Sequence, residues 1–253
     1  MIIRRLAEGL RKQDWSTAAV EFVIVVVGIF VGLQANNWNE ARLEQAQAHE
    51  NMQRLLDEAQ NAVAYTRREF ERGAERITAQ RALLDIMYSE APLPEDTSLA
   101  ERGFATLTFF PAMAPARTTY DELTASGGLR LIRSSHVRDM ISLYYAELDF
   151  FLAQQRYFRQ VALAAGNDPI TASTAYVGAE YAPDRATGRR YVFDWPRLRS
   201  DTQVGSLFVR ALRNQVVKNR NRKKLLERAQ IMCEAIADEI DKTCTPALSD
   251  GSG

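Results

Sequence analysis

Residues 15–39 read WSTAAVEFVIVVVGIFVGLQANNWN, and this apolar stretch decides how the rest of the chain is organised. Between Ala18 and Leu33 only Glu21 is strongly polar. Trp15 and Trp38 flank the stretch, and on a helix they would stand about 35 Å apart, a spacing that suits rings at the two faces of a bilayer. We therefore predict a transmembrane helix over residues 15–38, surrounded by membrane lipid and anchored at its interfaces by Trp15 and Trp38.

Two other structures compete with a membrane span. A cleaved signal peptide would use the basic start of the chain and a cut after Ala35, but Leu33 would then occupy a position that usually holds a small side chain. Glu21 also interrupts the apolar run that such a peptide needs. A buried helix of a soluble core is the second competitor, but few buried helices read VIVVVGIFVG without any polar face.

The flanking charges predict the orientation of the span. Residues 1–14 carry more lysine and arginine than acid, whereas residues 34–50 carry Arg42 against Glu40, Glu44 and Glu50. An excess of lysine and arginine stays on the cytoplasmic side. We predict a cytoplasmic basic segment over 1–14, a single pass through a bacterial inner membrane and a periplasmic main domain.

Composition is that of an ordinary folded domain. The chain of 253 residues is 46 % hydrophobic and 25 % charged with a formal net charge of zero. This length allows one sizeable core or two small ones, and the balanced charge gives no field that would attract nucleic acid.

Cys233 and Cys244 are the chain's two cysteines, and they form a candidate disulfide in an oxidising compartment. On a continuous helix they would stand about 16 Å apart, which is too far for a bond. A bridge therefore requires the last helix to end near Ile240 and the tail to fold back. Free thiols or an intermolecular bridge are the alternatives.

A long helix is predicted over residues 38–89, continuous with the span. Large apolar residues recur there every seven positions, and a second seam of small or polar residues follows at Met52, Ala59, Thr66, Gly73, Gln80 and Met87. A seam of this kind favours close packing by a neighbouring helix of the same chain. A coil between two copies is the alternative.

Breaker residues and capping patterns divide the remainder into helices. We predict short helices over 99–110 and 119–126, long helices over 136–165 and 201–241, an ordered crossover over 170–196, and a flexible tail over 246–253. The fold class is therefore all-α: an N-terminal transmembrane helix that continues into an elongated antiparallel helical bundle over residues 39–245.

One face of the span has the composition of a helix-association surface. Gly28 and Gly32 form a GxxxG pattern, Ala35 continues the small face, and Glu21 lies one heptad before Gly28. Small residues let helices approach closely in lipid, and a carboxylate there needs a partner. The four residues predict contact with a second copy or with another membrane protein. The alternative is that Glu21 reaches the headgroups alone.

Two segments carry a family resemblance. GIFVGLQANNWNE (residues 28–40) and TTYDELTASGGLRLIRSSHVRDMISLYY (residues 118–145) resemble motifs of an uncharacterised bacterial domain-of-unknown-function family of N-terminally anchored single-span membrane proteins. The resemblance implies the architecture and the anchoring. It implies no activity.

The second motif also offers a candidate ligand or partner site. A diglycine turn can expose backbone groups, and arginines can bind a carboxylate or phosphate. The site residues would be Tyr120, Asp121, Glu122, Arg130 and Arg133. The competing interpretation is a capped short helix that plugs the bundle while its charges pair locally.

No catalytic or metal-binding pattern stands out. His49 and His136 are the chain's two histidines, and neither has a ligand partner at a suitable spacing. A basic run over residues 210–228 is expected to pair with acids of the long first helix such as Glu58 and Glu69.

We predict no enzyme, no cofactor, no metal and no nucleic-acid partner. The predicted function is that of a membrane-anchored scaffold or accessory subunit that acts through homo- or hetero-oligomeric contacts. The alternative is a periplasmic ligand-sensing bundle with a site near residues 120–133.

Overall fold

The computed structural model describes residues 15–107, 112–166, 183–184, 188–189 and 193–246. The predicted cytoplasmic segment (1–14), most of the predicted crossover and residues 247–253 of the predicted tail lie outside the described residues. The described chain is helical apart from connections and one two-residue ladder. The predicted all-α class is therefore confirmed.

The elements follow one another in a simple order. They are α2 (Trp15–Tyr88), α3 (Ser98–Ala105), α4 (Thr118–Ser126), the 3₁₀ turn η1 (Gly128–Leu131), α5 (Ser135–Gly166), β1 (Pro183–Asp184), β2 (Gly188–Arg189), α7 (Trp195–Ser200) and α8 (Thr202–Glu239). β1 and β2 pair antiparallel, with Pro183 opposite Arg189.

Two helix boundaries differ from those expected. α3 ends at Ala105 rather than near Phe110, because the Thr106 N–H and hydroxyl both bond back to earlier carbonyls, the hydroxyl to Gly103 O at 2.9 Å. A separate short helix, α7, begins at the end of the predicted crossover and fills the residues before the predicted helix of 201–241. Asp194 starts it by accepting a hydrogen bond from the Arg197 N–H, and Pro196 suits its first turn.

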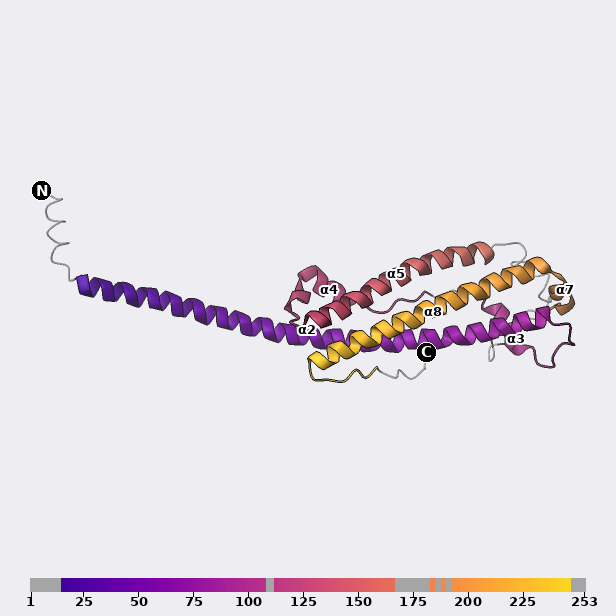
Figure 1. The fold of residues 1–253 in the computed structure, drawn as a ribbon, viewed down its shortest axis with the longest axis horizontal. Coiled ribbons are helices and arrows are strands. Elements are labelled where there is room, and N and C mark those ends of the chain that lie inside the picture. The colour runs from indigo at the N-terminus through magenta and orange to yellow at the C-terminus, as the bar shows by residue number, and fades with distance from the viewer. Residues whose placement is uncertain (1–14, 108–111, 167–182, 185–187, 190–192, 247–253) are drawn as a thin grey trace. The chain divides into compact units, whose positions relative to one another are not determined.

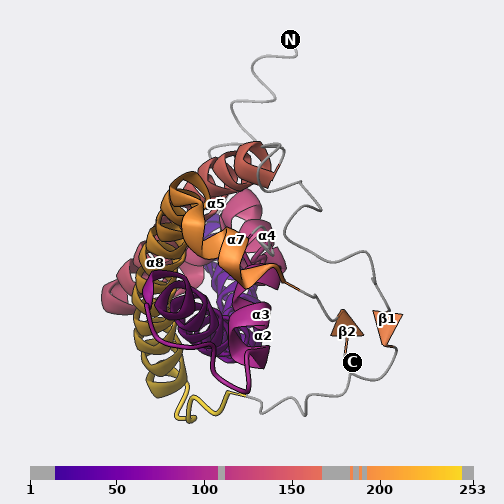
Figure 2. The same ribbon diagram turned by 90° about the vertical axis from the view of Figure 1, so that its right-hand side faces the viewer.

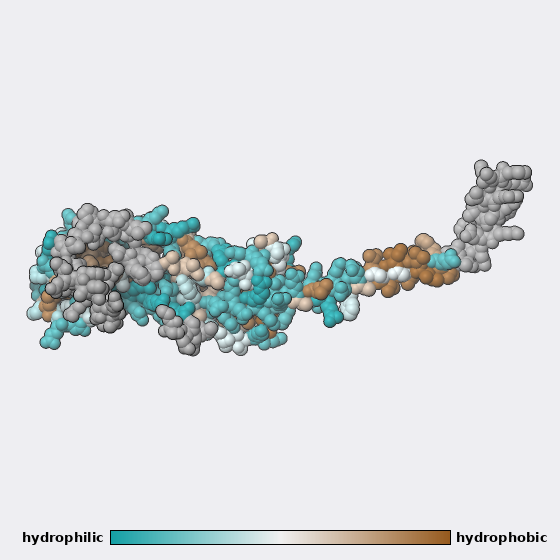
Figure 3. Space-filling view, turned by 180° about the vertical axis from the view of Figure 1, so that it is seen from behind, coloured by the Kyte–Doolittle hydropathy of each residue, from teal (hydrophilic) through white to brown (hydrophobic). Residues whose placement is uncertain are grey.

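The chain divides into two compact units, Met1–Asn51 and Met52–Gly253, and α2 contributes residues to both. In the first unit, residues 19–47 are all exposed. The N-terminal part of α2 is long and apolar enough to cross a membrane, and the most apolar window has no buried residue. Figure 3 shows this band as a brown surface followed by hydrophilic teal.

In the second unit, α5, α8 and the C-terminal half of α2 lie side by side (Figures 1 and 2). The contacts pair the part of α2 near Gln60 with the residues just after α8, and the end of α2 with the start of α8. Gln60 reaches the Thr243 carbonyl, Glu69 meets Arg222, and Tyr88 lies against Gly205. The three contacts fix how the two helices are aligned.

Two apolar clusters form the core of this unit. The larger includes Leu55, Val63, Ile141, Leu148, Leu225 and Ile236 from α2, α5 and α8. The smaller joins Leu83 and Met87 of α2 to Leu198 of α7 and Phe208 of α8. Between them along α2 and α8, the buried side chains are mostly polar, although Ala79 is buried there too. We call this set the polar layer: Thr66, Glu69, Arg76, Gln80, Gln215, Lys218, Asn219 and Arg222.

The small seam of α2 faces inward. Every one of its six residues from Met52 to Met87 is buried, whereas Phe70, Ile77 and Leu84 of the large seam are only half-buried. A helix of 3.6 residues per turn drifts against a seven-residue repeat, so the large seam turns partly away from the core along α2 while the small seam stays buried. Gly73 belongs to this stripe. A Cβ there would lie 2.0 Å from Asn219 Oδ1, so α8 packs directly on the backbone of α2.

The end of α8 allows the two cysteines to meet. The helix stops at Glu239, Asp241 adopts a positive φ of 53°, and the Lys242 N–H bonds back to Ala237 O at 2.9 Å. This reversal brings the Cα atoms of Cys233 and Cys244 to 5.6 Å, and the two residues form a disulfide.

Candidate functional site

The predicted association face of the first unit is open. A Cβ added at Gly28 or Gly32 would meet no atom within 4 Å, and Glu21 and Ala35 are exposed. The four residues share one side of α2 because they recur at helical spacing. Nothing in the described chain covers this side.

The interface residues are also exposed where they are described. Trp38 is 71 % exposed, and the Asn36 amide donates to Glu40 Oε1 at 2.7 Å one turn further along α2. Trp15 begins α2, but its side chain lies outside the described residues.

In the second unit, Glu58 of α2 holds the start of α4. The N-cap position of α4, Arg117, makes no side-chain capping bond. The carboxylate of Glu58 takes over this role and accepts from the backbone N–H groups of Thr119 at 2.7 Å and Tyr120 at 3.2 Å. The first N–H groups of a helix lack internal partners and carry partial positive charge, so a carboxylate is the best acceptor for them.

Tyr145 of α5 completes this contact. Its hydroxyl donates to Glu58 Oε1, and its ring stacks on Tyr120 with centroids 3.6 Å apart. Burial raises the pKa of Tyr145 well above its ordinary value, and the hydrogen bond to Glu58 adds to the rise. The phenol therefore stays protonated and serves as a donor. One carboxylate thus joins three helices.

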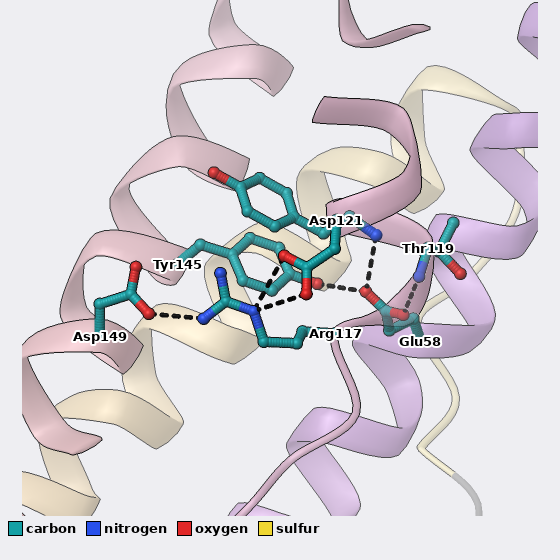
Figure 4. A network of polar contacts seen from close by, with 7 residues as sticks. Glu58, Arg117, Thr119, Asp121, Tyr145 and Asp149 are labelled. Atoms are coloured by element: carbon teal, nitrogen blue, oxygen red, sulfur yellow. Dashed lines mark hydrogen bonds and ion pairs between the residues drawn. The ribbon is translucent and has the colours of Figure 1, made fainter. Parts of the chain in front are cut away.

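Arg117 links α4 and α5 on the outer side of the same contact (Figure 4). Its Nε donates to both oxygens of Asp121, at 3.0 and 3.1 Å, and its Nη1 donates to Asp149. The guanidinium lies 5.7 Å from the ring centroids of both Tyr120 and Tyr145. The hydrogen bond to Asp149 raises the pKa of Arg117 further.

The residues of the predicted ligand or partner site separate into two groups. Tyr120 and Asp121 belong to this three-helix contact, and the Glu122 carboxylate pairs with both terminal nitrogens of Arg54, which lowers its pKa. Arg130 instead bonds to the Gly127 carbonyl at 3.3 Å. Arg133 is exposed, and its carbonyl accepts from Arg138 at 3.0 Å. The structure therefore does not bring Arg130 and Arg133 together with Asp121 and Glu122.

Sequence reasoning missed the residues that organise the contact, namely Glu58, Arg117, Tyr145 and Asp149. A signal was present for Glu58, because it interrupts an apolar stripe between Leu55 and Ala59. The sequence predicts that Glu58 pairs with the basic run of residues 210–228. That prediction is wrong, since the carboxylate is occupied by α4 and Tyr145.

Metal binding finds no support in the part of the chain that the structure describes, where no group of three or more His, Cys, Asp or Glu residues is placed to hold an ion. The polar groups of the α4 contact bind one another. These hydrogen bonds and ion pairs hold α4 against α2 and α5.

Comparison with known proteins gives no match to a family model, a curated protein or a solved structure. The resemblance to a family of single-span proteins stays a prediction.

Proposed function

We propose that the protein is a single-pass, membrane-anchored helical scaffold or accessory subunit that acts through contacts with copies of itself or with another membrane protein. In this proposal residues 15–38 cross a bacterial inner membrane, the N-terminus is cytoplasmic, and an elongated antiparallel bundle lies in the periplasm. The proposal includes no catalytic activity and no cofactor.

One observation carries the proposal. Residues 19–33 expose a continuous apolar surface, with Phe22 at 70 % and Ile24 at 64 % exposure, while the second unit has its own packed cores. A soluble protein would bury such a run, because each large apolar side chain left in water costs about 1.5–3 kcal/mol. Lipid removes that cost without any partner helix.

The open glycine face supports the choice of a scaffold. Lipid tails solvate large side chains as well as a partner would, so association in a membrane depends on close backbone approach and polar contacts. Gly28, Gly32 and Ala35 permit the approach, and Glu21 supplies the polar group.

Ligand sensing at residues 120–133 receives no comparable support. The Asp121 and Glu122 carboxylates are paired with Arg117 and Arg54, and the ring of Tyr120 is stacked. We therefore do not propose ligand sensing as a second function.

The test is native mass measurement of the full-length protein in detergent. We expect the wild type to run as an oligomer and the variant Gly28→Leu with Gly32→Leu to run as a monomer. Val26→Leu with Phe30→Leu is the matched control on the opposite face of α2, and it should keep the wild-type mass. A double glycine variant that assembles like the wild type would contradict the assigned face. A wild-type monomer would contradict self-association, and crosslinking in native membranes then decides whether a second protein is bound.

A further inference from the structure

A row of apolar side chains runs along the outward side of α5. The helix buries its other side in the larger core through residues such as Ile141 and Leu148. We call the outward row the outer seam: Leu143, Ala146, Phe150, Ala153 and Tyr157. All five are exposed, Phe150 to 55 % and Tyr157 to 64 %. The outward face of a surface helix is normally polar, so the outer seam needs an explanation beyond the folding of one chain.

The spacing of the outer seam is that of a helix which packs against another helix. Its members are separated by three and four residues in alternation, which keeps them on one side of α5 and repeats every seven positions. Asp149 and Arg156 lie along one edge, and Glu147 lies along the other, 3.7 Å from Lys224. A helix that rests on lipid would instead carry lysine and arginine at its edges. The outer seam therefore suits a protein helix better than a bilayer.

We propose that the outer seam binds the outer seam of a second copy of this chain, with the two α5 helices antiparallel. Large and small side chains alternate along the seam. An antiparallel pair sets Phe150 against Ala153 of the second copy and Tyr157 against Ala146 of the second copy, and the twofold axis repeats each contact. A parallel pair would set equal residues against one another and would leave the alanine layers poorly filled.

The same alignment pairs opposite charges along the edge of the seam. Asp149 directly precedes Phe150, and Arg156 directly precedes Tyr157. Antiparallel helices that match Phe150 with Ala153 therefore bring Asp149 opposite Arg156 of the second copy. Both residues are exposed, and the Asp149 side chain is 61 % exposed although it also accepts from Arg117. Because size and charge are complementary in one register, the partner that fits this seam is a second copy of the chain.

The outer seam is too small to hold two copies together at low protein concentration. Its five side chains expose on the order of 400 Å² per copy. Each partner of a stable complex buries about 800 Å², so this contact belongs to the weak class. At the low concentration of a native mass measurement it leaves the glycine variant monomeric. The inference deepens the proposed self-association, but it concerns the second unit alone and does not require the membrane anchor.

The experiment is sedimentation equilibrium of the full-length protein in detergent. The chain carries Gly28→Leu with Gly32→Leu, so that the glycine face of the span does not contribute. We expect a reversible dimer with a dissociation constant on the order of 0.1–1 mM. Phe150→Ser should weaken this dimer by about tenfold or more, because each copy loses a large apolar contact. Val209→Ser is the matched control, since Val209 is 46 % exposed and lies on α8 outside the seam.

Arg156→Glu tests the charge pairing at the edge of the seam. It sets an acid against Asp149 of the second copy at two symmetric places, so the dimer should weaken by about threefold or more at low salt. Arg159→Glu is the matched control, because Arg159 is exposed, lies away from the seam and changes the net charge equally. Equal effects of Arg156→Glu and Arg159→Glu would overturn the proposed register.

Disulfide crosslinking determines the direction of the pair. Cys233 and Cys244 already form a disulfide, so an added cysteine supplies the reactive thiol. Chains with Ala146→Cys are mixed with chains with Tyr157→Cys, two positions that stand about 16 Å apart along one helix. We expect a crosslink between the two different chains and none between equal chains.

Three results would overturn the proposal. Crosslinks between equal chains alone would show a parallel pair. Equal weakening by Phe150→Ser and Val209→Ser would show that the seam is not the contact. A glycine variant that stays monomeric up to about 1 mM would overturn the outer seam and leave the contact through the span standing.

Discussion

Replacement of Lys218 by methionine should stabilise the protein at neutral pH and remove most of its pH dependence above neutrality. Lys218 is 1 % exposed, and within the described residues the charges of Arg222 on its own helix and of Arg76 and Glu69 on α2 act on it. Burial is the main cause that lowers its pKa from 10.5 to about 7. An unfolded lysine keeps a pKa of about 10.4. Between these two values the unfolded chain binds a proton that the folded chain does not, so stability rises as pH increases.

The magnitude follows from the same two pKa values. Below about pH 7 both states are protonated, and burying the charge costs up to roughly 5 kcal/mol. Raising the pH from about 7 to about 9 should recover about 2 kcal/mol of the free energy of unfolding. Methionine fills a similar volume without charge. Substitution of buried ions by apolar residues stabilises proteins by about 1–4 kcal/mol, which is the gain we expect at pH 7.

The assay is urea unfolding of the detergent-solubilised protein, followed by circular dichroism in phosphate-free buffers between about pH 6 and pH 9. Lys223→Met is the matched control, since Lys223 is exposed and lies 3.8 Å from Glu227. It should keep the wild-type slope. The reasoning is refuted if wild-type stability is flat or falls over this range, or if Lys218→Met is less stable than the wild type at pH 7.

Three further substitutions test the remaining packing arguments. Glu58→Ala should lower the free energy of unfolding by about 3–5 kcal/mol, because it leaves the Tyr145 hydroxyl and two α4 N–H groups without their acceptor. Urea unfolding measures the loss, and a loss below about 1 kcal/mol would mean that α4 does not need this carboxylate. Cys233→Ser with Cys244→Ser opens a loop that spans 11 residues and should lower the free energy of unfolding by about 2–3 kcal/mol. The wild type should show no free thiol on titration under denaturing, non-reducing conditions, and two free thiols would contradict the bridge. Gly73→Ala should lower the free energy of unfolding by about 1–3 kcal/mol, since the new Cβ would overlap Asn219 Oδ1. Gly28→Ala is the control and should leave unfolding of the second unit unchanged. Equal effects of the two substitutions would contradict the close approach of α2 and α8.

The features that sequence reasoning predicted well are local ones. Gly127 ends α4 with a φ of 73°, as a left-handed cap requires. Asp201 starts α8 by accepting from the N–H groups of Gln203 and Val204. Both signals depend on residues within one turn of the helix end, so the sequence carries them directly. Thr97 occupies the N-cap position of α3, where its hydroxyl donates to Glu101 Oε1 at 2.7 Å and caps no backbone N–H.

The α4 contact and the polar layer depend on residues far apart in the chain. Glu58 and Tyr145 are 87 positions apart, so no local pattern could predict their hydrogen bond. The basic run of residues 210–228 resembles a solvated surface in the sequence. Only Lys218 and Arg222 of its cations face inward, because they lie opposite the stripe of α2 that contains Gly73. Their inward direction follows from how α2 and α8 are aligned, which periodicity within one helix does not determine.

The central claim is that residues 15–38 hold the protein in a lipid bilayer. Alkaline carbonate extraction of membranes from cells that express the full-length chain tests it most directly. Because the exposed apolar surface of residues 19–33 needs lipid, the protein should stay in the membrane pellet and leave it only with detergent. Full-length protein in the carbonate supernatant would contradict the account.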